Sequence, residues 1–581
     1  MKVIKPLFID ELEAQFEKSK NDKRALQTLH NRISKLKFLD PACGCGNFLI
    51  ISYRELRLLE LKLVKQLLKN QQVTSINDYF LVDVDQFYGI EYEDFPSQIA
   101  QVAMWLIDHQ MNEMASLEFG EYYKRIPLKK SATIAHGNAL RIDWQSLLPD
   151  NEKYDYIFGN PPFIGYAWQS VEQKKDLESI FSGVDGGGVL DYVSAWYAKS
   201  AKYMNDYNPT SEKDFTKLTK AAFVSTNSIS QGEQVAMLWN DLINKYKLHI
   251  HFAHRTFKWD NEARGNAAVH VVIIGFANFD VADKTIYQYE NIKGEPHAVK
   301  AKNINPYLVD AKNIFIKKRS SPICKVPSIC RGSDAIDDGN LLLNQEDRDK
   351  LLVKYPDAIN FIRPFLMARE FINNIPRYCI WLKDVELSEL KNFPDIYERV
   401  ENVKAFRNKS KRVQTLKAAK FPYLFGEERQ PNSDYLAIPK VSSVPIGFCS
   451  ENIICGDKLF NLPNATLYHF GIPTSMMQMV WMRSKCGRLK SDYSYSNTIV
   501  YNNYPWPENP TNKQKAIVEA AAQGVLDARL QFPNASLADL YDPNTMPPVL
   551  VKAHQALDKA VDLCYRSQPF PNETKRIDFF V

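Results

Sequence analysis

The chain has no long apolar run and no dense cysteine pattern. Its longest apolar run, residues 267–276, is interrupted by a histidine and is too short to cross a bilayer, so we expect no membrane partner. Nine cysteines are scattered along the chain, and the closest pairs, Cys43/Cys45 and Cys324/Cys330, lack the spacing of zinc ligands. We therefore expect no metal site and interpret the cysteines as reduced cytosolic thiols.

The chain also lacks a strong excess of one charge. A formal net charge of +5 does not establish a nucleic-acid partner, so any DNA contact must come from local basic clusters. With 45% hydrophobic and 24% charged residues, the composition excludes the disordered class. At 581 residues the chain is too long for one core and predicts about two to four domains.

The first chemical signal is a glycine-rich turn after a predicted strand at residues 37–39. The turn reads Asp40-Pro41-Ala42-Cys43-Gly44-Cys45-Gly46-Asn47-Phe48, and a helix is predicted over about residues 50–68. A strand, a glycine-rich turn and a helix open a doubly wound α/β fold, in which the glycines let the backbone approach a ligand closely. The turn lacks the third glycine of the dinucleotide fingerprint, so by itself it is a weak signal.

Two later positions strengthen this signal. Glu91 ends the next predicted strand, where a carboxylate can accept hydrogen bonds from both hydroxyls of a ribose. A lone glutamate is more often a solvated surface acid, but the glycine-rich turn before it favours the ligand interpretation. Residues 134–140 lead into a loop that could hold an adenine ring, with Asn138 and Ala139 as candidate contacts.

Asn160-Pro161-Pro162-Phe163, after a short apolar strand at residues 154–159, is the most restricted stretch of the chain. Asn160 must be extended because it precedes a proline. Both prolines have fixed φ and no N–H, so the Asn160 side-chain oxygen and nearby carbonyls become acceptors in a rigid turn. Phe163 adds a flat apolar face. The stretch predicts a pocket for a flat ring with an amino substituent, such as a nucleobase.

Two further segments could surround this pocket. Strands at residues 249–252 and 267–276 predict an antiparallel hairpin, with Phe257 and Trp259 in its connection. An exposed aromatic ring there could form a second wall for a base, although Trp259 could equally pack at a rim. Residues 183–188 predict a mobile loop above the site, with a simple surface linker as an equal alternative.

From residue 303 to residue 507 the strand–helix periodicity is lost, and residues 511–566 return to helix-forming sequence. A basic run is usually a solvated face. After a catalytic α/β domain, the basic residues become candidates for contacts to DNA phosphates. These candidates are Lys404, Arg407, Lys411, Arg412, Arg488 and Lys490.

The turn at residues 40–48 resembles the cofactor motif of S-adenosylmethionine-dependent DNA methyltransferases that act on exocyclic amino groups, and residues 160–163 resemble their catalytic Asn-Pro-Pro-Phe/Tyr motif. The motif order is similar to that of the gamma group. A closer resemblance, over nearly the whole chain, is to the methyltransferase and target-recognition portions of MmeI-like restriction-modification fusion proteins. Cys45 stands where these proteins usually have serine, and we expect little effect from it.

The resemblance implies a fold and a domain order. We expect a Rossmann-like class I methyltransferase domain with a mixed seven-stranded sheet over residues 1–300, an irregular α+β target-recognition domain over residues 301–507, and a C-terminal helical segment over residues 508–581. MmeI-like fusions begin with a nuclease, a helical linker and a further cofactor motif. Because residues 1–8 resemble the segment directly after that motif, we expect this part to be missing or supplied by a separate nuclease-containing polypeptide.

The resemblance also implies residue roles in methylation of a flipped-out adenine in double-stranded DNA, in a prokaryotic cytoplasm, with a monomer favoured. Catalysis would fall to Asn160, Pro161, Pro162 and Phe163, and stacking on the target base to Phe163, Phe257 and Trp259. S-adenosyl-L-methionine would be bound by Asp40, Pro41, Ala42, Gly44, Gly46, Asn47, Phe48, Glu91, Asn138 and Ala139.

Three alternatives remain open from the sequence. The same Asn-Pro-Pro motif serves methylation of the cytosine 4-amino group, with adenine favoured by the family and by Phe163. A protein-glutamine methyltransferase also uses this motif, but the long recognition-like sequence after the core argues against it. A DNA-binding specificity module with a crippled cofactor site is the alternative from another class.

Overall fold

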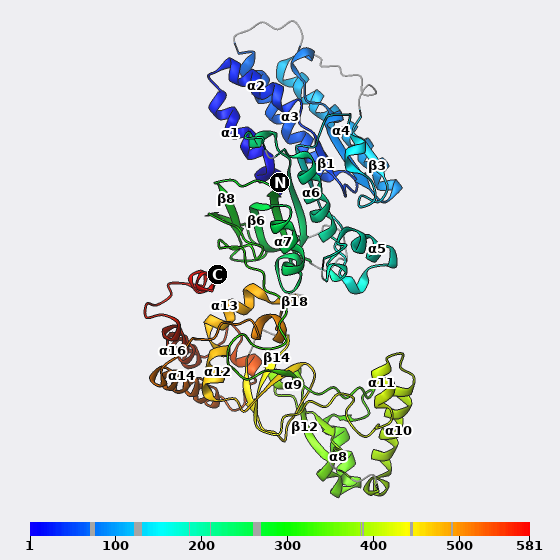
Figure 1. The fold of residues 1–581 in the computed structure, drawn as a ribbon, viewed down its shortest axis with the longest axis vertical. Coiled ribbons are helices and arrows are strands. Elements are labelled where there is room, and N and C mark those ends of the chain that lie inside the picture. Colours follow the sequence, from blue (N-terminus) through cyan, green and yellow to red (C-terminus); the bar gives the residue numbers. More distant parts are fainter. Residues whose placement is uncertain are drawn as a thin grey trace. The chain divides into compact units, whose positions relative to one another are not determined.

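The computed structural model describes residues 1–69, 76–120, 131–184, 186–209, 211–259, 269–383, 385, 388–441, 445–489 and 492–580. The chain divides into two compact units, Met1–Phe315 and Ile316–Val581 (Figure 1). Over the described ranges, no helix is long and apolar enough to cross a membrane.

The first unit is built on one mixed sheet. Its strands are β1 (Phe38–Asp40), β2 (Phe87–Glu91), β3 (Thr133–His136), β4 (Tyr156–Gly159), β5 (Lys220–Thr226), β6 (His249–Trp259), β7 (Val269–Ala277), β8 (Lys284–Gln288) and β9 (His297–Ala301). They lie in the order β3-β2-β1-β4-β5-β7-β6-β8-β9. Strands β1 to β5 are parallel to one another, and β7 is antiparallel to both β5 and β6. The predicted mixed α/β fold is confirmed, and within the described ranges β8 and β9 extend the predicted seven strands to nine.

The strand order reverses next to β1. The chain moves from β1 through β2 to β3 on one side, and then returns to place β4 on the other side of β1. The registers pair Leu39 of β1 with Tyr88 of β2 and with Ile157 of β4. Ligands of open α/β sheets bind at the carboxyl ends of the strands where the order reverses. The turns after β1 and β4 are therefore the expected location of a site.

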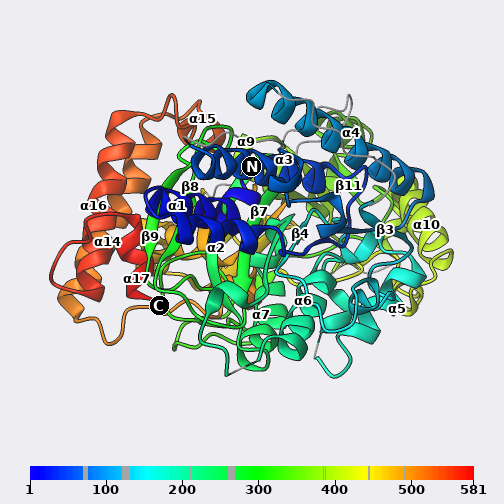
Figure 2. The same ribbon diagram turned by 90° about the horizontal axis from the view of Figure 1, so that it is seen from above.

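Helices cover both faces of this sheet (Figure 2). They are α1 (Asp10–Ser19), α2 (Lys23–Ile33), α3 (Asn47–Leu67), α4 (Asp94–Phe119), α5 (Val171–Ile180), α6 (Ser194–Tyr207) and α7 (Gln234–Asn244). Helices α1 to α4 lie on one face, where Phe8 packs on Phe38 and Tyr156. Helices α6 and α7 lie on the other face, where Tyr197 contacts Phe223 and Trp239. The alternation of side chains along each strand supplies apolar groups to both layers.

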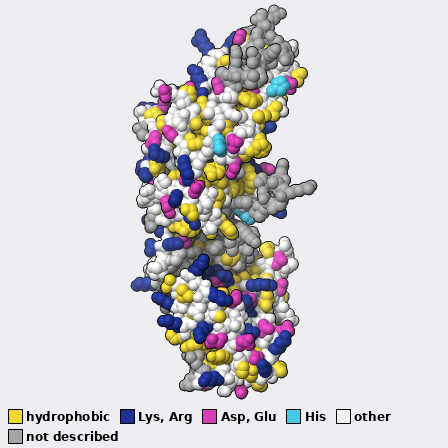
Figure 3. Space-filling model, turned by 90° about the vertical axis from the view of Figure 1, so that its right-hand side faces the viewer, with side chains coloured by type: hydrophobic (Ala, Val, Ile, Leu, Met, Phe, Trp, Pro, Cys, Tyr) yellow, Lys and Arg dark blue, Asp and Glu magenta, His cyan; other side chains and the backbone are white. Residues whose placement is uncertain are grey.

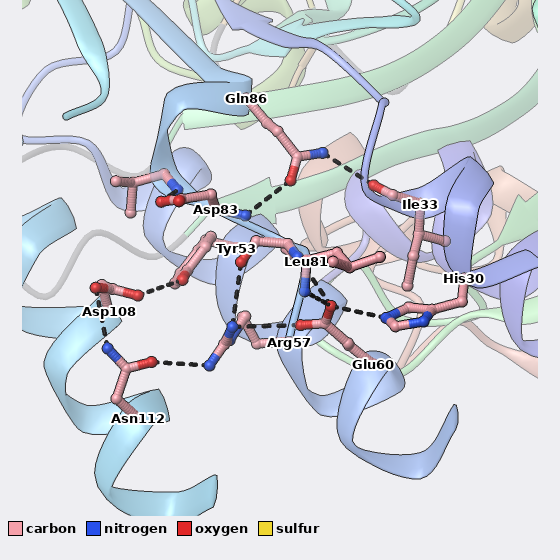
Figure 4. A network of polar contacts seen from close by, with 12 residues as sticks. His30, Ile33, Tyr53, Arg57, Glu60, Leu81, Asp83, Gln86, Asp108 and Asn112 are labelled. Atoms are coloured by element: carbon pink, nitrogen blue, oxygen red, sulfur yellow. Dashed lines mark hydrogen bonds and ion pairs between the residues drawn. The ribbon is translucent and has the colours of Figure 1, made fainter. Parts of the chain in front are cut away.

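A buried polar network fastens α2, α3 and α4 together (Figure 4). Glu60 accepts hydrogen bonds from the backbone N–H groups of Leu81 and Val82 at 2.6 and 2.8 Å. Its carboxylate also lies 3.0 Å from His30 Nε2 and 3.3 Å from the Arg57 guanidinium. Because buried charges are stable only when they are paired, this network holds the helical layer in one arrangement.

The described part of the second unit contains two four-stranded sheets and a small hairpin. The sheets have the orders β10-β17-β14-β15 and β11-β13-β12-β16, and β18 pairs with β19. The strands are β10 (Cys330–Arg331), β11 (Leu342–Leu343), β12 (Ile362–Leu366), β13 (Tyr378–Ile380), β14 (Tyr435–Pro439), β15 (Gly447–Cys449), β16 (Ile454–Cys455), β17 (Leu459–Pro463), β18 (Gly487–Leu489) and β19 (Asp492–Ser494). These short strands fit the expected irregular α+β region.

The helices of the second unit fall into two groups. The first comprises α8 (Gln345–Lys354), α9 (Ala368–Asn373), α10 (Pro394–Asn408) and α11 (Val413–Ala418). The second comprises α12 (Leu467–Thr474), α13 (Met476–Lys485), α14 (Asn512–Leu530), α15 (Leu537–Leu540), α16 (Pro548–Tyr565) and α17 (Glu573–Phe579). Helix α14 packs against α12 and α16, so the C-terminal helices belong to the same compact unit as the strands.

Candidate active site

The glycine-rich turn joins β1 to α3. Gly44 and Gly46 have φ values of 54° and 85°, in the left-handed region that side chains other than glycine rarely adopt. A Cβ atom at Gly46 would lie 3.2 Å from the side chain of Ala100 in α4, whereas a Cβ at Gly44 would meet nothing within 4 Å. The turn therefore needs glycine at 46 for packing and conformation, and at 44 for conformation. Helix α3 begins at Asn47, three residues before the predicted start.

Asp40 lies at the last position of β1 and is fully buried. Its Oδ1 accepts a hydrogen bond from the Ala42 N–H at 3.0 Å, while its Oδ2 has no hydrogen-bond partner among the described residues. A Cβ at Gly159 of β4 would clash with Asp40 Oδ1, so only glycine fits beside this carboxyl group. Burial, reinforced by the nearby charge of Glu91, raises the pKa of Asp40 to about 8.

Glu91 ends β2 beside this turn. Its carboxylate accepts hydrogen bonds from the backbone N–H groups of Gly44 at 2.8 Å and Glu93 at 3.0 Å. These bonds fix the carboxylate at the tip of the second strand, where it lines a cavity of about 450 Å³. This volume is within the range of about 300–1,000 Å³ that small-molecule sites occupy.

The same cavity reaches the Asn-Pro-Pro-Phe turn. Residues 160–163 follow β4 directly, with Asn160 exposed, Pro161 buried and Phe163 half-buried against the core. Asn160 and Pro162 line the cavity. The structure thus brings the two sequence motifs, 120 positions apart at Asp40 and Asn160, to one edge of the sheet.

Most of the predicted cofactor contacts meet at this cavity, and some do not. The predicted residues that line it are Pro41, Ala42, Gly44, Glu91, Asn138, Ala139, Asn160 and Pro162. Asp40, Gly46, Asn47 and Phe48 are outside its lining; Phe48 lines a second cavity of about 410 Å³ together with Phe257 and Trp259.

Asn138 has less freedom to bind a ligand than the sequence suggests. Its Oδ1 accepts from the Leu140 N–H at 2.9 Å, and its Nδ2 donates to Asp176 Oδ2 at 3.0 Å. The Tyr192 hydroxyl also lies within hydrogen-bond reach of the Asn138 side chain, so both amide hydrogens of Asn138 face protein groups.

Asp176 of α5 is a cavity-lining residue that the sequence did not reveal. Besides Asn138, it accepts hydrogen bonds from the Tyr192 hydroxyl at 3.0 Å and from Arg141 Nε at 2.8 Å. The Trp196 indole N–H donates to the Pro41 carbonyl at 3.0 Å, and so joins α6 to the glycine-rich turn. No local sequence pattern marks these residues, because each acquires its partner only through the fold.

The predicted position of the aromatic wall is wrong. Phe257 and Trp259 lie in strand β6 rather than in the connection, because β6 continues to Trp259. Phe257 is 5% exposed and stacks on Tyr289 with ring centroids 4.9 Å apart, so it belongs to the core. Trp259 is half-buried and, like Phe163, packs at the edge of the same core cluster. The predicted mobile loop at residues 183–188 overlaps a short 3₁₀ turn at Gly187–Val189, and Asp185 lies outside the described residues.

The prediction that Arg407 contacts DNA is also wrong. Its guanidinium is buried and donates to the carbonyl groups of Ile336, Ala418, Phe421, Ala335 and Leu424 at 2.7–3.2 Å. Arg407 therefore holds loops of the second unit together and presents no charge to DNA. Burial also lowers its pKa. The sequence does not distinguish Arg407 from the basic residues around it, such as Lys404 and Lys411, which are exposed.

The other predicted basic residues differ in position. Lys404, Lys411 and Arg412 are exposed on or beside α10 and α11. Figure 3 shows Lys and Arg side chains interspersed with Asp and Glu on the face that it presents. Arg488 lies in β18, and Lys490 lies outside the described residues. Among the described residues, no group of three or more His, Cys, Asp or Glu side chains forms a metal site.

The fold and the site define a class of protein: a Rossmann-like α/β domain of methyltransferase type, followed by a recognition region and C-terminal helices. Three family models match consecutive parts of the chain. They are the MmeI DNA-methyltransferase domain over residues 16–288, the MmeI target recognition domain over residues 310–508 and the MmeI C-terminal domain over residues 510–581.

Two relatives cover nearly the whole chain. A solved structure of the Type IIL restriction-modification enzyme MmeI in complex with DNA has a TM-score of 0.90 and 48% identity, covering 99% of this chain and 76% of that one. "DNA methyltransferase A" of Bacillus subtilis (strain 168) is 38% identical over 100% of this chain. The chain belongs to the MmeI family. It spans 64% of the length of the Bacillus subtilis relative.

Proposed function

We propose that this chain is a DNA methyltransferase that transfers a methyl group from S-adenosylmethionine to the 6-amino group of an adenine. The observation that supports this most is the unpaired, buried Oδ2 of Asp40, on the strand next to the one that leads into Asn160. A buried carboxyl oxygen without a donor is costly unless a ligand supplies one. The amino group of a methionine moiety is a donor of this kind.

The residues at the strand edge fit this cofactor. Asp40 would accept from its amino group, and Glu91 would accept from its ribose hydroxyls. Asn138, which lines the cavity, would contact the adenine ring. Gly44 leaves open space where a side chain would otherwise project. When bound, the cofactor supplies an electrophilic methyl group.

Asn160 and Pro161 would then act on the target base. The lone pair of an adenine amino nitrogen is delocalised into the ring, which makes the nitrogen a poor nucleophile. The Asn160 side-chain oxygen and the Pro161 carbonyl would accept its two hydrogens and favour a pyramidal nitrogen. This mechanism relies on positioning and on fixed dipoles. Phe163 and Trp259, which pack at the edge of one core cluster, are the candidate rings for stacking on the base.

Double-stranded DNA is the proposed partner. A paired adenine must leave the helix to reach Asn160, at a cost of about a few kcal/mol. The matches to the MmeI target recognition domain and to MmeI in complex with DNA support a DNA-binding role for the second unit. Lys404, Lys411 and Arg412 are its candidate phosphate contacts.

The test is methylation of duplex DNA with labelled S-adenosylmethionine, comparing the wild-type chain with Asn160→Ala. We expect the variant to lose transfer by at least about 100-fold, since it loses an acceptor used in the transition state, and to keep cofactor affinity. Binding is measured by calorimetry, and the product is identified as a modified nucleoside. An unchanged transfer rate in Asn160→Ala would overturn the proposal.

The same experiment separates two other functions. Modified cytosine in place of modified adenine would assign the chain to cytosine 4-amino methylation. DNA binding without any cofactor heat would instead indicate a specificity module. Sequencing the DNA of a host that expresses the chain, with a readout of modified adenine, would give the recognition sequence.

A further inference from the structure

The Asn-Pro-Pro-Phe turn has an anchor at its carboxyl end. Pro161 and Pro162 have no N–H groups, so this turn has few donors with which to hold its own position. Ile164, the next residue, is bonded on both sides: its N–H donates to Asp191 Oδ1 at 3.1 Å, and its carbonyl accepts from the Tyr192 N–H at 3.0 Å. The Gln169 side-chain amide also donates to that carbonyl at 2.9 Å.

Asp191 connects this anchor to the rest of the sheet edge. The residue is 5% exposed. Its Oδ1 also accepts from the Val193 N–H at 3.3 Å, and its Oδ2 accepts from the Thr226 hydroxyl at 3.1 Å and the Ser228 hydroxyl at 3.5 Å. Thr226 is the last residue of β5, and Val193 directly precedes α6. One carboxyl group thus joins the turn after β4, the end of β5 and the start of α6.

Asp191 is also separate from the cofactor cavity. The lining of that cavity includes Ile164 and Tyr192 but not Asp191. Asp40 is also outside the lining, but its Oδ2 has no partner among the described residues, whereas both carboxyl oxygens of Asp191 accept hydrogen bonds. Asp176, in contrast, lines the cavity and bonds Asn138. The two aspartates therefore support different parts of the site, one the catalytic turn and the other the proposed adenine-binding loop.

We infer that Asp191 is a positioning residue for methyl transfer, which holds Asn160 and Pro161 in place through Ile164 and makes no contact with cofactor or base. This inference rests on the proposed function. A misplacement of reacting groups by about 1 Å can lower a rate about 100-fold. Loss of the Asp191 carboxyl group should therefore slow transfer and leave cofactor affinity unchanged.

The test compares single-turnover methylation at saturating cofactor with cofactor affinity from calorimetry. For Asp191→Ala we expect a rate about 100-fold lower and an affinity within about twofold of wild type. Asp191→Asn can still accept from the Ile164 N–H and donate to Thr226, so most of the rate should return. Asp176→Ala should show the opposite pattern, with weaker cofactor binding and a largely retained rate at saturation.

Two further variants keep the test decisive. Thr226→Val removes the hydroxyl group that orients Asp191 Oδ2 and should lower the rate with a normal affinity, even where Asp191→Ala does not fold. Asp206→Ala, an exposed aspartate of α6 that pairs with Lys202, is the matched control and should match wild type.

A wild-type rate in Asp191→Ala, or equal losses of rate and cofactor affinity in it, would overturn the inference. So would an Asp191→Asn variant as slow as Asp191→Ala. Failure of the wild-type chain to methylate DNA would overturn the proposed function, and this inference with it.

Discussion

Glu60 and Asp40 are both buried carboxyl groups of the first unit, and their surroundings differ. Glu60, in the helical layer, has His30, Arg57 and two backbone N–H groups as partners. Asp40, at the strand edge, has one backbone N–H for Oδ1 and no partner for Oδ2 among the described residues. A fully paired carboxylate stabilises the fold, whereas a half-paired one is retained against its cost in stability. The difference distinguishes an acid that stabilises the fold from one that we propose binds a ligand.

Among these variants, Glu60→Ala should cause the largest loss of folding stability. The change removes the carboxylate beside the buried Arg57 guanidinium, which keeps the Val82 carbonyl and Asn112 Oδ1 as acceptors, and leaves two backbone N–H groups without their acceptor. We expect a loss of about 3–5 kcal/mol in the free energy of unfolding. Urea denaturation followed by circular dichroism measures it.

Asp40→Asn is the matched control for Glu60→Ala. It replaces a half-paired carboxyl group, whose burial costs stability at pH 7, by a neutral amide, so the unfolding midpoint at pH 7 should be at or above that of wild type. A larger loss in Asp40→Asn than in Glu60→Ala would contradict the comparison.

In the second unit, Arg407→Ala and Lys411→Ala compare a buried with an exposed basic residue, and we expect smaller changes in stability than for Glu60→Ala. Arg407 satisfies five backbone carbonyl groups, and its loss should cost at least about 1–3 kcal/mol of stability. Lys411 is exposed, so its loss should leave stability within about 0.5 kcal/mol. For Lys411→Ala we expect instead a shallower salt dependence of DNA binding, by about one unit of slope.

The measurements are thermal unfolding and a salt titration of binding to duplex DNA. A stable Arg407→Ala variant that binds DNA less tightly would restore Arg407 as a DNA contact. An unchanged salt slope in Lys411→Ala would remove Lys411 from the DNA surface.

The sequence predicted the parts of the site that depend on local spacing. The turn after Asp40, the strand that ends at Glu91 and the turn at Asn160 are each encoded by adjacent residues with restricted backbones. Their meeting at one sheet edge arises from the parallel order of the strands.

Contacts between distant residues were not predictable in this way. Asp176 and Asp191 become significant only because α5 and the start of α6 fold back on the loops after β3 and β4. Arg407 is predicted to be exposed because it lies in a basic run, and Phe257 because the strand before it is predicted to end at residue 252. The partners of both come from other segments. Local composition reports the average environment of a segment and cannot identify the one side chain that points inward.

In the proposed function, the unpaired oxygen of Asp40 binds the cationic amino group of S-adenosylmethionine. Its pKa is raised from 3.8 to about 8, so the group is mostly protonated at pH 7 in the free protein. Its contribution to folding stability is full below pH 3.8 and is lost as the pH rises through about 8. A cation bound beside it favours the carboxylate, so binding at pH 7 should release a proton.

The measurement is calorimetry with S-adenosylmethionine at pH 6, 7, 8 and 9, for the wild-type chain and Asp40→Asn. We expect wild-type affinity to rise by up to about tenfold per pH unit below pH 8 and to level off above it. Asp40→Asn should bind at least about tenfold more weakly at pH 8, with a flat pH profile. Equal affinity of the two proteins, or a wild-type affinity that falls from pH 6 to pH 8, would contradict the assignment of Asp40 to the cofactor.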